Sequence, residues 1–178
     1  PAISVLLAEG QSHGRGRTQR RWHSPMGVNV YMSAALEWQA PLGALAGITP
    51  ALGIGVARAL QSCGAADITV KWPNDVYHAG AKVAGVLVET SAVRRDIHRV
   101  VVGIGINVLP DPTELDVGQS RSTLQAACAE ASVSRERVAA KLVTAVCATF
   151  DAFASSGLAT FRHDWERFDH FAGKTVVA

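Results

Sequence analysis

The hydrophobic pattern changes along the chain, from short strand-like runs to longer helix-like repeats. Runs rich in β-branched residues, or apolar at every second position, predict strands over residues 2–8, 28–36, 67–72, 83–89 and 99–108. Residues 2–8 (AISVLLA) are apolar almost throughout, so we expect this strand to be buried. We expect a turn at residues 73–75, a hairpin loop at 78–80 and a longer loop over 111–120.

The first helix is predicted over residues 41–63. Its apolar side chains recur at helical spacing, at Leu42, Leu45, Leu52, Val56 and Leu60. Pro50 should break or kink this helix, because proline lacks the backbone N–H and clashes with the preceding turn. Gly64 is the expected C-terminal stop.

Three more helices are predicted in the second half of the chain. A short one covers residues 123–129, and a long one begins after the N-cap Ser134 and runs to about residue 154. One face of the long helix is apolar, at Val138, Leu142, Val146, Phe150 and Phe153. The last helix covers residues 158–168, and we interpret its aromatic side chains as core, at Phe161, Trp165 and Phe168.

This order of elements predicts an α+β fold. Short loops join most neighbouring strands, so their pairing should be antiparallel. We expect a mixed, largely antiparallel sheet with helices packed on one face, in one domain of 178 residues. Residues 174–178 should begin a further strand.

Composition and charge exclude several function classes. The net charge is only +2, so the positive charge is local and a general nucleic-acid binder is not indicated. Residues 40–57 are uncharged, but two prolines and four glycines favour a core helix over a membrane span. Three separated cysteines without a CxxC motif, and scattered histidines, argue against a zinc site and for a reducing, cytoplasmic compartment.

The most unusual stretch lies at residues 13–23 (HGRGRTQRRWH). Four arginines fall within seven residues, and no acidic residue lies between Gly10 and Ala35. Guanidinium groups bind phosphate and carboxylate oxygens in a bidentate manner, and glycine lets the backbone approach a ligand closely. The stretch alone is equally consistent with an anion-binding loop and with a solvated basic surface loop.

Further polar motifs end or follow predicted strands. Residues 71–75 (KWPND) combine a cation, an aromatic ring, an amide and a carboxylate, and residues 82–89 (KVAGVLVE) follow at once. Residues 103–107 (GIGIN) end a later strand with an amide, a group that can recognise the edge of adenine. Each motif alone could be no more than a strand-ending turn.

Together and in this order, the motifs resemble those of the biotin–protein ligases. These enzymes attach biotin to acetyl-CoA carboxylase and related carboxylases. The matching segments are E-x-Q-x-x-G-R-G-R from Glu9, R-x-W-x-S-P from Arg20, N-x-Y-x-S from Asn29, K-W-P-N-D, K-x-A-G-x-L-x-E and G-x-G-x-N. The resemblance implies the fold of class II aminoacyl-tRNA synthetases and biotin synthetases, which agrees with the predicted α+β layout.

The resemblance also implies domain boundaries. Residues 1–172 would form the catalytic biotin- and ATP-binding domain, and residues 173–178 the start of the family's small C-terminal barrel. The family's Ser-Thr-Asn segment, which contacts the biotin ring, is expected upstream of Pro1. The family's loop usually carries a glycine where this chain has Gln19.

The activity implied is a two-step reaction in one site. Biotin and ATP give biotinyl-5′-AMP and pyrophosphate, and a lysine of a biotin carboxyl carrier protein then takes the biotin and releases AMP. The catalytic residues would be Arg17, Lys82 and Asp75, with Asp75 orienting the incoming lysine. Mg²⁺ would accompany ATP, without a metal site of the protein's own.

The resemblance assigns ligand contacts to the same motifs. Biotin would be bound by Gln11, Gly14, Arg15, Gly16, Arg17 and Lys82. ATP and the adenylate would be bound by Arg17, Arg20, Trp22, Asn74 and Asn107. We expect neither nucleic-acid nor membrane binding by these residues, and the resemblance leaves a homodimer open.

Two other functions remain as alternatives. A lipoate–protein ligase shares a related fold and the same acyl-adenylate chemistry, but G-R-G-R and K-W-P-N-D favour biotin. A biotin-responsive DNA repressor would need a basic helix-turn-helix, and these residues contain no such pattern, although a longer parent chain could carry one.

Overall fold

A computed structural model describes residues 2–111, 120–128 and 132–175. The strands are β1 (Ile3–Ala8), β2 (Val30–Trp38), β3 (Ile68–Lys71), β4 (Asp75–His78), β5 (Ala81–Arg94) and β6 (Ile97–Ile106). The α-helices are α1 (Ile48–Ser62), α2 (Leu124–Ala127), α3 (Arg135–Ser156) and α4 (Arg162–Phe168). Short 3-10 turns are η1 (Arg17–Gln19), η2 (Leu42–Leu45) and η3 (Gly157–Phe161).

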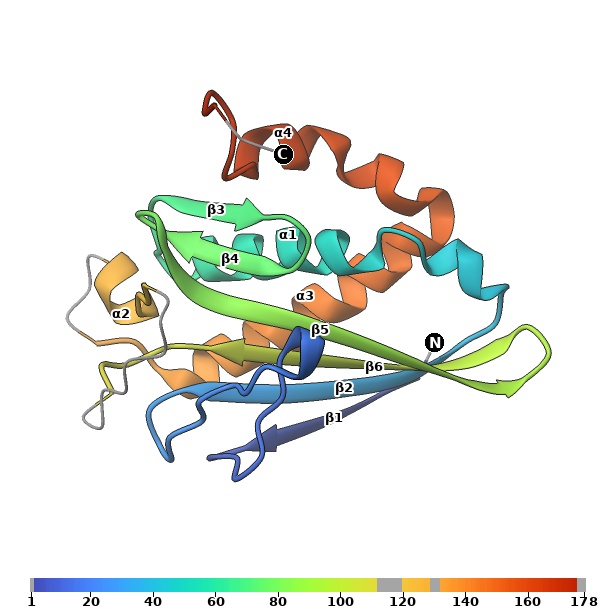
Figure 1. Ribbon diagram of the computed structural model, residues 1–178, viewed down its shortest axis with the longest axis horizontal. Helices are drawn as coiled ribbons and strands as arrows, with labels where there is room; N and C mark the ends of the chain where they lie inside the picture. Colours follow the sequence, from blue (N-terminus) through green and yellow to red (C-terminus); the bar gives the residue numbers. More distant parts are fainter. Residues whose placement is uncertain (1, 112–119, 129–131, 176–178) are drawn as a thin grey trace.

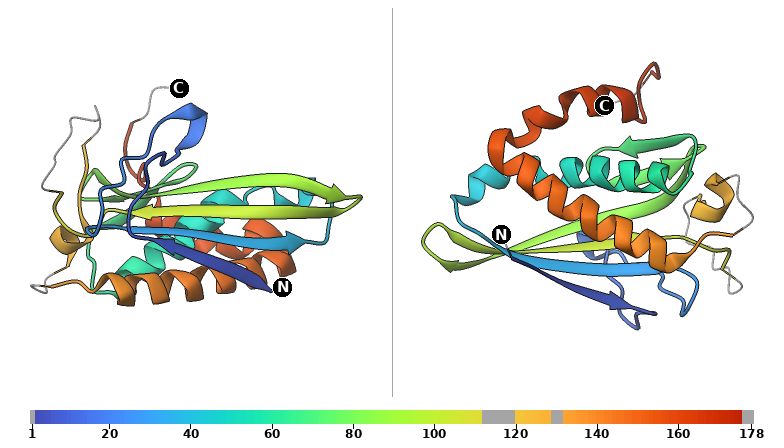
Figure 2. Two further views of the ribbon diagram at one scale, coloured as in Figure 1. Left: turned by 90° about the horizontal axis from the view of Figure 1, so that it is seen from below. Right: turned by 180° about the vertical axis from the view of Figure 1, so that it is seen from behind.

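The six strands form one sheet in the order β1-β2-β6-β5-β4-β3, and every neighbouring pair is antiparallel. Helices α1 and α3 cover one face, while the loop before β2 lies on the other (Figures 1 and 2). The predicted α+β class, with helices on one face of the sheet, is therefore confirmed. Alternation along the strands explains the two faces, because successive side chains point in opposite directions.

The core lies between the sheet and helices α1 and α3. The predicted apolar face of the long helix is buried there, and the Ser134 hydroxyl accepts a hydrogen bond from the backbone N–H of Arg137, as expected of an N-cap. Phe161 and Phe168 are buried and Trp165 packs on the same core, so the aromatic stripe is core as predicted. Two helical stretches, Leu42–Ser62 and Arg135–Phe168, are long and apolar enough to cross a membrane, but α1 owes this composition to its burial in the core.

Two predictions about the first half of the chain were wrong in detail. The first strand is not buried: β1 is an edge strand that pairs only with β2, and Val5, Leu6 and Leu7 are exposed. Pro50 does not break α1, because it lies in the first turn, where the backbone N–H has no helical partner. The break falls earlier, at Gly47, whose φ of 90° separates η2 from α1.

The turn after β3, predicted at residues 73–75, was also misplaced, whereas the hairpin loop predicted at 78–80 agrees with the turn at residues 79–80. Asp75 begins β4, a strand absent from the prediction, so the turn covers residues 72–74. The predicted last helix is split into η3 and α4. Lys174 and Thr175 are not in a strand, and the rest of the predicted final strand lies outside the described residues, as does most of the predicted loop over 111–120.

Candidate functional site

A row of paired residues crosses the face of the sheet opposite α1 and α3. Lys71 pairs with Asp75, Asp75 with Gly85, Gly85 with Gly105, and Gly105 with Tyr31. Paired residues of neighbouring strands share one face, so this row forms the floor of a surface that the helices do not cover. Above it lies a groove of about 920 Å³, lined by residues of β2 to β6 and of the loop before β2.

The two glycines of the row make room for Trp22. A Cβ atom at Gly85 would lie 2.9 Å from Trp22 Cζ3, and one at Gly105 would lie 2.5 Å from Trp22 Cε2. The indole therefore rests directly on the backbones of β5 and β6. Its Nε1 is buried and has no hydrogen-bond partner among the described residues, which leaves a donor for a bound ligand.

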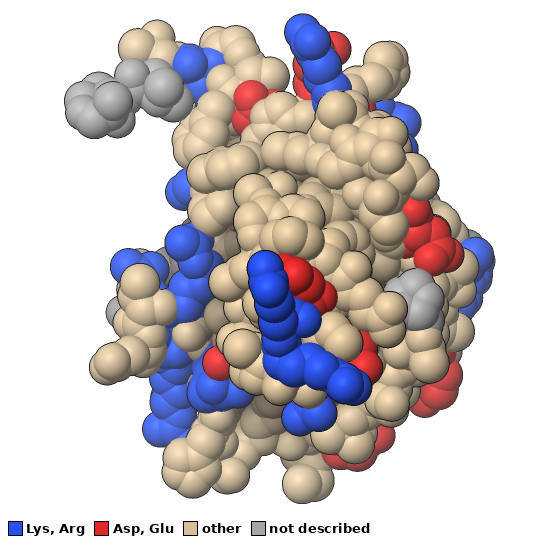
Figure 3. All heavy atoms as spheres, turned by 90° about the vertical axis from the view of Figure 1, so that its right-hand side faces the viewer, with Lys and Arg blue, Asp and Glu red and all other residues tan. Residues whose placement is uncertain are grey.

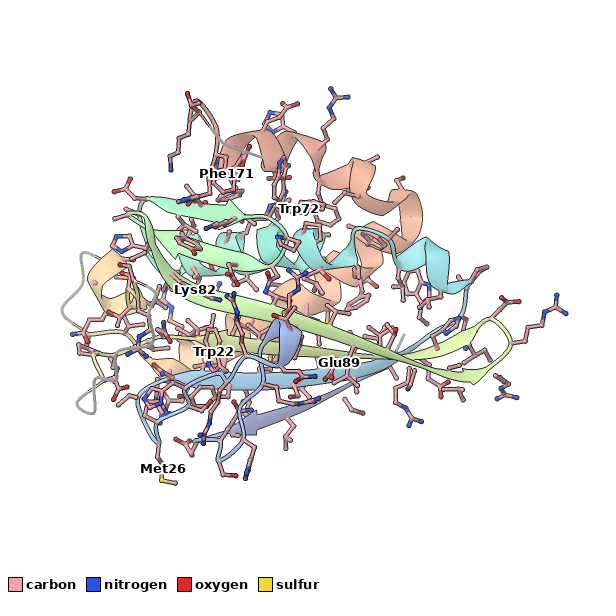
Figure 4. All side chains as sticks on the ribbon, in the orientation of Figure 1. Trp22, Met26, Trp72, Lys82, Glu89 and Phe171 are labelled. Atoms are coloured by element: carbon pink, nitrogen blue, oxygen red, sulfur yellow. The ribbon has the colours of Figure 1, made fainter. Side chains whose placement is uncertain are left out.

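A lysine–carboxylate pair lies beside the indole. Lys82 Nζ is 2.7 Å from Asp75 Oδ1 and 5.2 Å from the centre of a Trp22 ring (Figure 4). Both charged side chains are mostly buried, 16% and 19% exposed, so their interaction is screened less than that of a surface pair. The backbone of Lys82 is held by Ser120 and Ser122 through hydrogen bonds of 3.0 and 2.8 Å. The structure thus places two of the three predicted catalytic residues, Lys82 and Asp75, in direct contact.

The segment of residues 9–27, here called the arginine loop, covers the groove. Arg15 donates two hydrogen bonds of 2.7 Å to the Glu89 carboxylate on β5. Arg17 Nη1 donates to Asn74 Oδ1 over 3.1 Å, which ties the loop to the turn between β3 and β4. Arg20 is exposed on the same loop. Figure 3 views the molecule from the end where the β5–β6 hairpin lies, and it shows Lys and Arg side chains along the left edge and others at the centre beside acidic ones.

The start of the arginine loop is held by its own polar contacts. The Ser24 hydroxyl donates to Gln11 Oε1 over 2.7 Å, so the amide nitrogen of Gln11 is the group left for a ligand. A Cβ atom at Gly14 would lie 2.6 Å from Ser24 Oγ, so only glycine fits there. Gln19 has a φ of 60°, in the left-handed region that glycine adopts without strain.

A smaller cavity of about 190 Å³ adjoins the groove near the end of β6, with Asn107, Arg121 and Thr123 in its wall. Asn107 Nδ2 donates to the carbonyl of Lys82 over 3.3 Å, which fixes the ends of β5 and β6. His23 Nε2 lies 2.7 Å from Asp111 Oδ2, so the arginine loop is also joined to the segment after β6.

Tyr31 closes the row on the β2 side. Its hydroxyl donates to the carbonyl of Pro25 over 2.9 Å and accepts from Asn29 Nδ2 over 3.0 Å. Burial raises the pKa of Tyr31 above its ordinary value, and the Asp111 carboxylate contributes in the same direction. The hydroxyl therefore stays protonated at neutral pH and acts as a fixed support for the loop.

Every predicted site residue except Gly14 lines the groove. Sequence reasoning assigned no role to four residues that shape it: Gly85, Gly105, Glu89 and Arg121. The glycines could have been found, because glycine on the outward-facing side of a strand often marks a site where another group approaches the backbone. The described residues contain no group of three His, Cys, Asp or Glu side chains arranged to hold a metal ion.

Comparison with known proteins identifies similar sequences among protein ligases. Residues 2–107 match the family model described as "Biotin/lipoate A/B protein ligase family". The chain is 37% identical to "Bifunctional ligase/repressor BirA" of Escherichia coli over 97% of this chain and 53% of that protein. It is 33% identical to "Biotin--[acetyl-CoA-carboxylase] ligase" of Mycobacterium tuberculosis over 78% of this chain and 51% of that protein.

A solved structure shows the same fold. The biotin protein ligase of Aquifex aeolicus in complex with biotin and ATP has a TM-score of 0.77 and 28% identity, covering 94% of this chain and 68% of that one. The chain spans about half the length of the curated relatives that it matches. The matched model, the relatives and the shared fold together show that this chain belongs to the biotin/lipoate A/B protein ligase family.

Proposed function

We propose that the chain is the catalytic region of a biotin–protein ligase that activates biotin with ATP and transfers it to a carrier lysine. The contact between Lys82, Asp75 and Trp22 on the glycine floor carries this proposal. It joins a buried cation, a carboxylate and an aromatic surface within one groove, beneath a loop of arginines. Family membership and the relatives named as biotin ligases support the same reading.

In the first step, the biotin carboxylate attacks the α-phosphorus of ATP, and pyrophosphate leaves. Both reactants are anions, so catalysis depends on positioning and on charge stabilisation. Lys82 lies where its ammonium can bridge the biotin carboxylate and the α-phosphate, since it is on the floor of the groove beside Trp22. Arg17 and Arg20 supply phosphate contacts from the arginine loop.

The remaining contacts follow from the same placement. Arg15 and Gly16 lie in the loop over biotin, Gln11 donates a hydrogen bond to it, and Trp22 covers the adenine or the closed loop. Asn74 and Asn107 face the polar edges of the adenylate. Binding requires Arg15 and Arg17 to exchange their present partners, Glu89 and Asn74, for ligand atoms.

In the second step, an amine of the carrier lysine attacks the acyl carbon of biotinyl-AMP, the bond to phosphate oxygen breaks, and AMP leaves. Asp75 accepts a proton from the arriving ammonium, because a general base acts within hydrogen-bond reach of the proton it takes. In the present structure this carboxylate is paired with Lys82, whose Nζ lies 2.7 Å from Asp75 Oδ1. Once Lys82 binds the adenylate, Asp75 becomes available to the amine.

Mg²⁺ would enter with ATP as the metal–nucleotide complex. The two carboxylates nearest the site, Asp75 and Glu89, are each paired with a cation of the chain. Neither is therefore a ready metal ligand, whereas triphosphate oxygens bind Mg²⁺ well. Titration of Mg²⁺ at fixed ATP tests this, and a rate that follows free Mg²⁺ instead of MgATP would contradict it.

The partner in the second step would be a biotin carboxyl carrier protein of acetyl-CoA carboxylase. None of the three cysteines forms a disulfide in the described part of the chain, which suits a reducing cytoplasm. A homodimer is compatible with this activity, and sedimentation of the purified chain with and without biotin and ATP decides it.

The direct test incubates the purified chain with biotin, ATP and Mg²⁺ and follows biotinyl-AMP, pyrophosphate and carrier labelling. Lipoate replaces biotin in a parallel reaction, because the matched family includes both ligase types. We expect adenylation and carrier labelling with biotin. Equal or greater turnover of lipoate would reverse the substrate assignment, and no adenylate from either acid would overturn the function.

A further inference from the structure

Lys71, at the end of β3, is a charged side chain that the proposed steps leave without a role. It lines the groove, one strand beyond Asp75 in the row that also contains the glycine floor. Lys82 and Arg15 each have a carboxylate partner, but no carboxylate lies within ion-pair distance of Lys71 in the described part of the chain. Its positive charge therefore faces the groove uncompensated.

Two aromatic rings hold this ammonium in place. Lys71 Nζ lies 5.4 Å from the ring centre of Tyr77 and 5.7 Å from that of Phe171. Attraction to ring faces orients a cation without neutralising its charge, unlike a carboxylate. The site thus presents a preoriented positive charge that is still free to pair with an anion.

The ring of Phe171 is positioned by a segment that follows α4. Residues 169–171 dock against β3, where the backbone N–H of His170 donates to the carbonyl of Val70 over 3.0 Å. His170 Nδ1 lies 2.9 Å from Thr69 Oγ1. Burial lowers the pKa of His170, and Lys174 and Lys71 lower it further, so the histidine adds no second charge beside Lys71 at neutral pH.

The neighbouring Trp72 is supported in the same way. Its ring meets that of Trp165 edge to face, with ring centres 5.4 Å apart. Figure 4 shows Trp72 and Phe171 on the side of the groove beyond Lys82, away from Glu89. Helix α4 and the segment after it therefore support the β3 end of the groove.

We propose that Lys71 binds the β- and γ-phosphates of ATP, the part that leaves as pyrophosphate. The inference rests on the proposed function, which places the α-phosphate at Lys82. When the carboxylate oxygen bonds to the α-phosphorus, the bond to the bridging oxygen breaks and its electron pair stays on pyrophosphate. The Lys71 ammonium stabilises that growing negative charge electrostatically, and no proton is transferred. Phe171 acts as a positioning residue for Lys71.

The test uses inorganic pyrophosphate with Mg²⁺ as the probe and compares the wild-type chain with Lys71→Met. Methionine keeps an unbranched side chain against the two rings but removes the charge. We expect the Kd for pyrophosphate, and its KM in the reverse reaction from biotinyl-AMP, to rise about tenfold or more, the scale of one charge-assisted hydrogen bond. The biotin Kd and the transfer of biotin from preformed biotinyl-AMP should change less than about twofold, since pyrophosphate takes no part in them.

Lys174→Met is the matched control, because Lys174 is exposed, also acts on His170 and does not line the groove. It should leave the pyrophosphate Kd unchanged. Lys71→Arg keeps the charge and should retain most of the affinity. Phe171→Leu should weaken pyrophosphate binding less than Lys71→Met, again without affecting biotin. Circular dichroism establishes that each variant is folded, and Lys71→Gln replaces Lys71→Met if the latter is not.

Two results would overturn the proposal. One is an unchanged pyrophosphate Kd in the folded charge-removing variant, and the other is an equal loss of pyrophosphate and biotin affinity. Failure of the wild-type chain to form any adenylate would count against the proposed function instead. The direct pyrophosphate titration would still decide whether Lys71 forms the anion site.

Discussion

The two faces of the central sheet are built from the same strands but by opposite means. On the core face, Met32, Val76 and Ile104 are at most 2% exposed and fill space against α1 and α3. On the site face, Gly85 and Gly105 leave space that Trp22 occupies, and charged side chains such as the Lys82–Asp75 pair line the groove. The core face depends on summed volume, which many apolar residues can provide. The site face depends on individual residues, namely on the missing side chains of two glycines and on the charges of a few others. Single substitutions there should therefore alter the chemistry more than the stability.

The strongest test of this contrast is Asp75→Asn, which keeps the shape of the side chain and removes its charge and basicity. We expect transfer from purified biotinyl-AMP to the carrier lysine to slow about 10²–10⁴-fold, the range for loss of a general base. Adenylate formation should survive, because Lys82 gains freedom to bind anionic substrates when its 2.7 Å partner loses its charge. Equally fast transfer in both proteins would show that Asp75 only supports the turn.

Next in size is Lys82→Ala, which removes the buried cation of the same pair. Adenylate formation should lose roughly 2–4 kcal/mol of transition-state stabilisation, the scale for one preorganised charge contact. Single-turnover formation of biotinyl-AMP measures this loss. Lys71→Ala is the comparison, since it should act mainly through ATP and pyrophosphate affinity. An unchanged adenylation rate in Lys82→Ala would remove Lys82 from the mechanism.

Substitutions in β6 test the two faces separately, because Gly105 and Ile106 are neighbours in sequence but lie on opposite faces of the sheet. Gly105→Ala puts a Cβ where Trp22 lies, at 2.5 Å, so the indole must shift and adenylation should fall about tenfold or more, as for a misplaced catalytic group. Gly103→Ala meets only ordinary contacts at 3.8 Å and should change little. Ile106→Val, on the core face, should cost about 0.5–1.5 kcal/mol of unfolding free energy without changing adenylation.

If Gly105→Ala and Ile106→Val instead reduce stability and activity in the same proportion, the division between the two faces is wrong. Denaturant unfolding and single-turnover adenylation of the four proteins, wild type included, decide the point together.

The smallest expected effect concerns His170, at the outer end of the site face. Burial first, then Lys174 and Lys71, lower its pKa, so the undocked segment binds a proton more readily than the docked one. Docking of residues 169–171 should therefore be strongest above the ordinary histidine pKa of about 6.5 and weaken as the pH falls below it. Amide exchange of the His170 N–H, which bonds to Val70, measures this between pH 5 and 8 after correction for intrinsic rates.

The His170→Gln variant is the control, since glutamine can keep a polar contact with Thr69 but does not titrate. It should lose the pH dependence of exchange. Protection that rises as the pH falls would contradict the stated direction of the His170 pKa shift.

The sequence predicted the core face well because alternation and helical spacing report burial directly. The apolar face of α3 and its Ser134 cap are examples. The prediction failed at β1, where apolar composition suggested burial although the strand lies at the edge of the sheet. A run of apolar residues does not indicate which strands or helices will pack against it. The prediction also failed at β4, a strand of four residues that is too short for alternation to stand out from the turn before it.

The candidate site was predicted as a set of residues but not as an arrangement. Motifs identified Lys82, Asp75 and Trp22, yet nothing in their spacing showed that a bulge between Val76 and Tyr77 shifts the pairing with β5 beside Lys82. The same holds for Lys71, whose partner Phe171 lies a hundred residues further along the chain. Long-range contacts of this kind come from tertiary packing, which local sequence patterns do not encode.

Because Trp22 lies in the arginine loop, its fluorescence can report on the position of that loop. Its indole touches the glycine backbones, lies near the Lys82 ammonium and belongs to a segment that the proposed function expects to rearrange when ligands enter. Trp38 packs against the core, and the rings of Trp72 and Trp165 meet edge to face. A chain in which these three are replaced by phenylalanine would emit from the loop alone. Any movement of the arginine loop on addition of biotin and ATP could then be timed by stopped-flow fluorescence of Trp22.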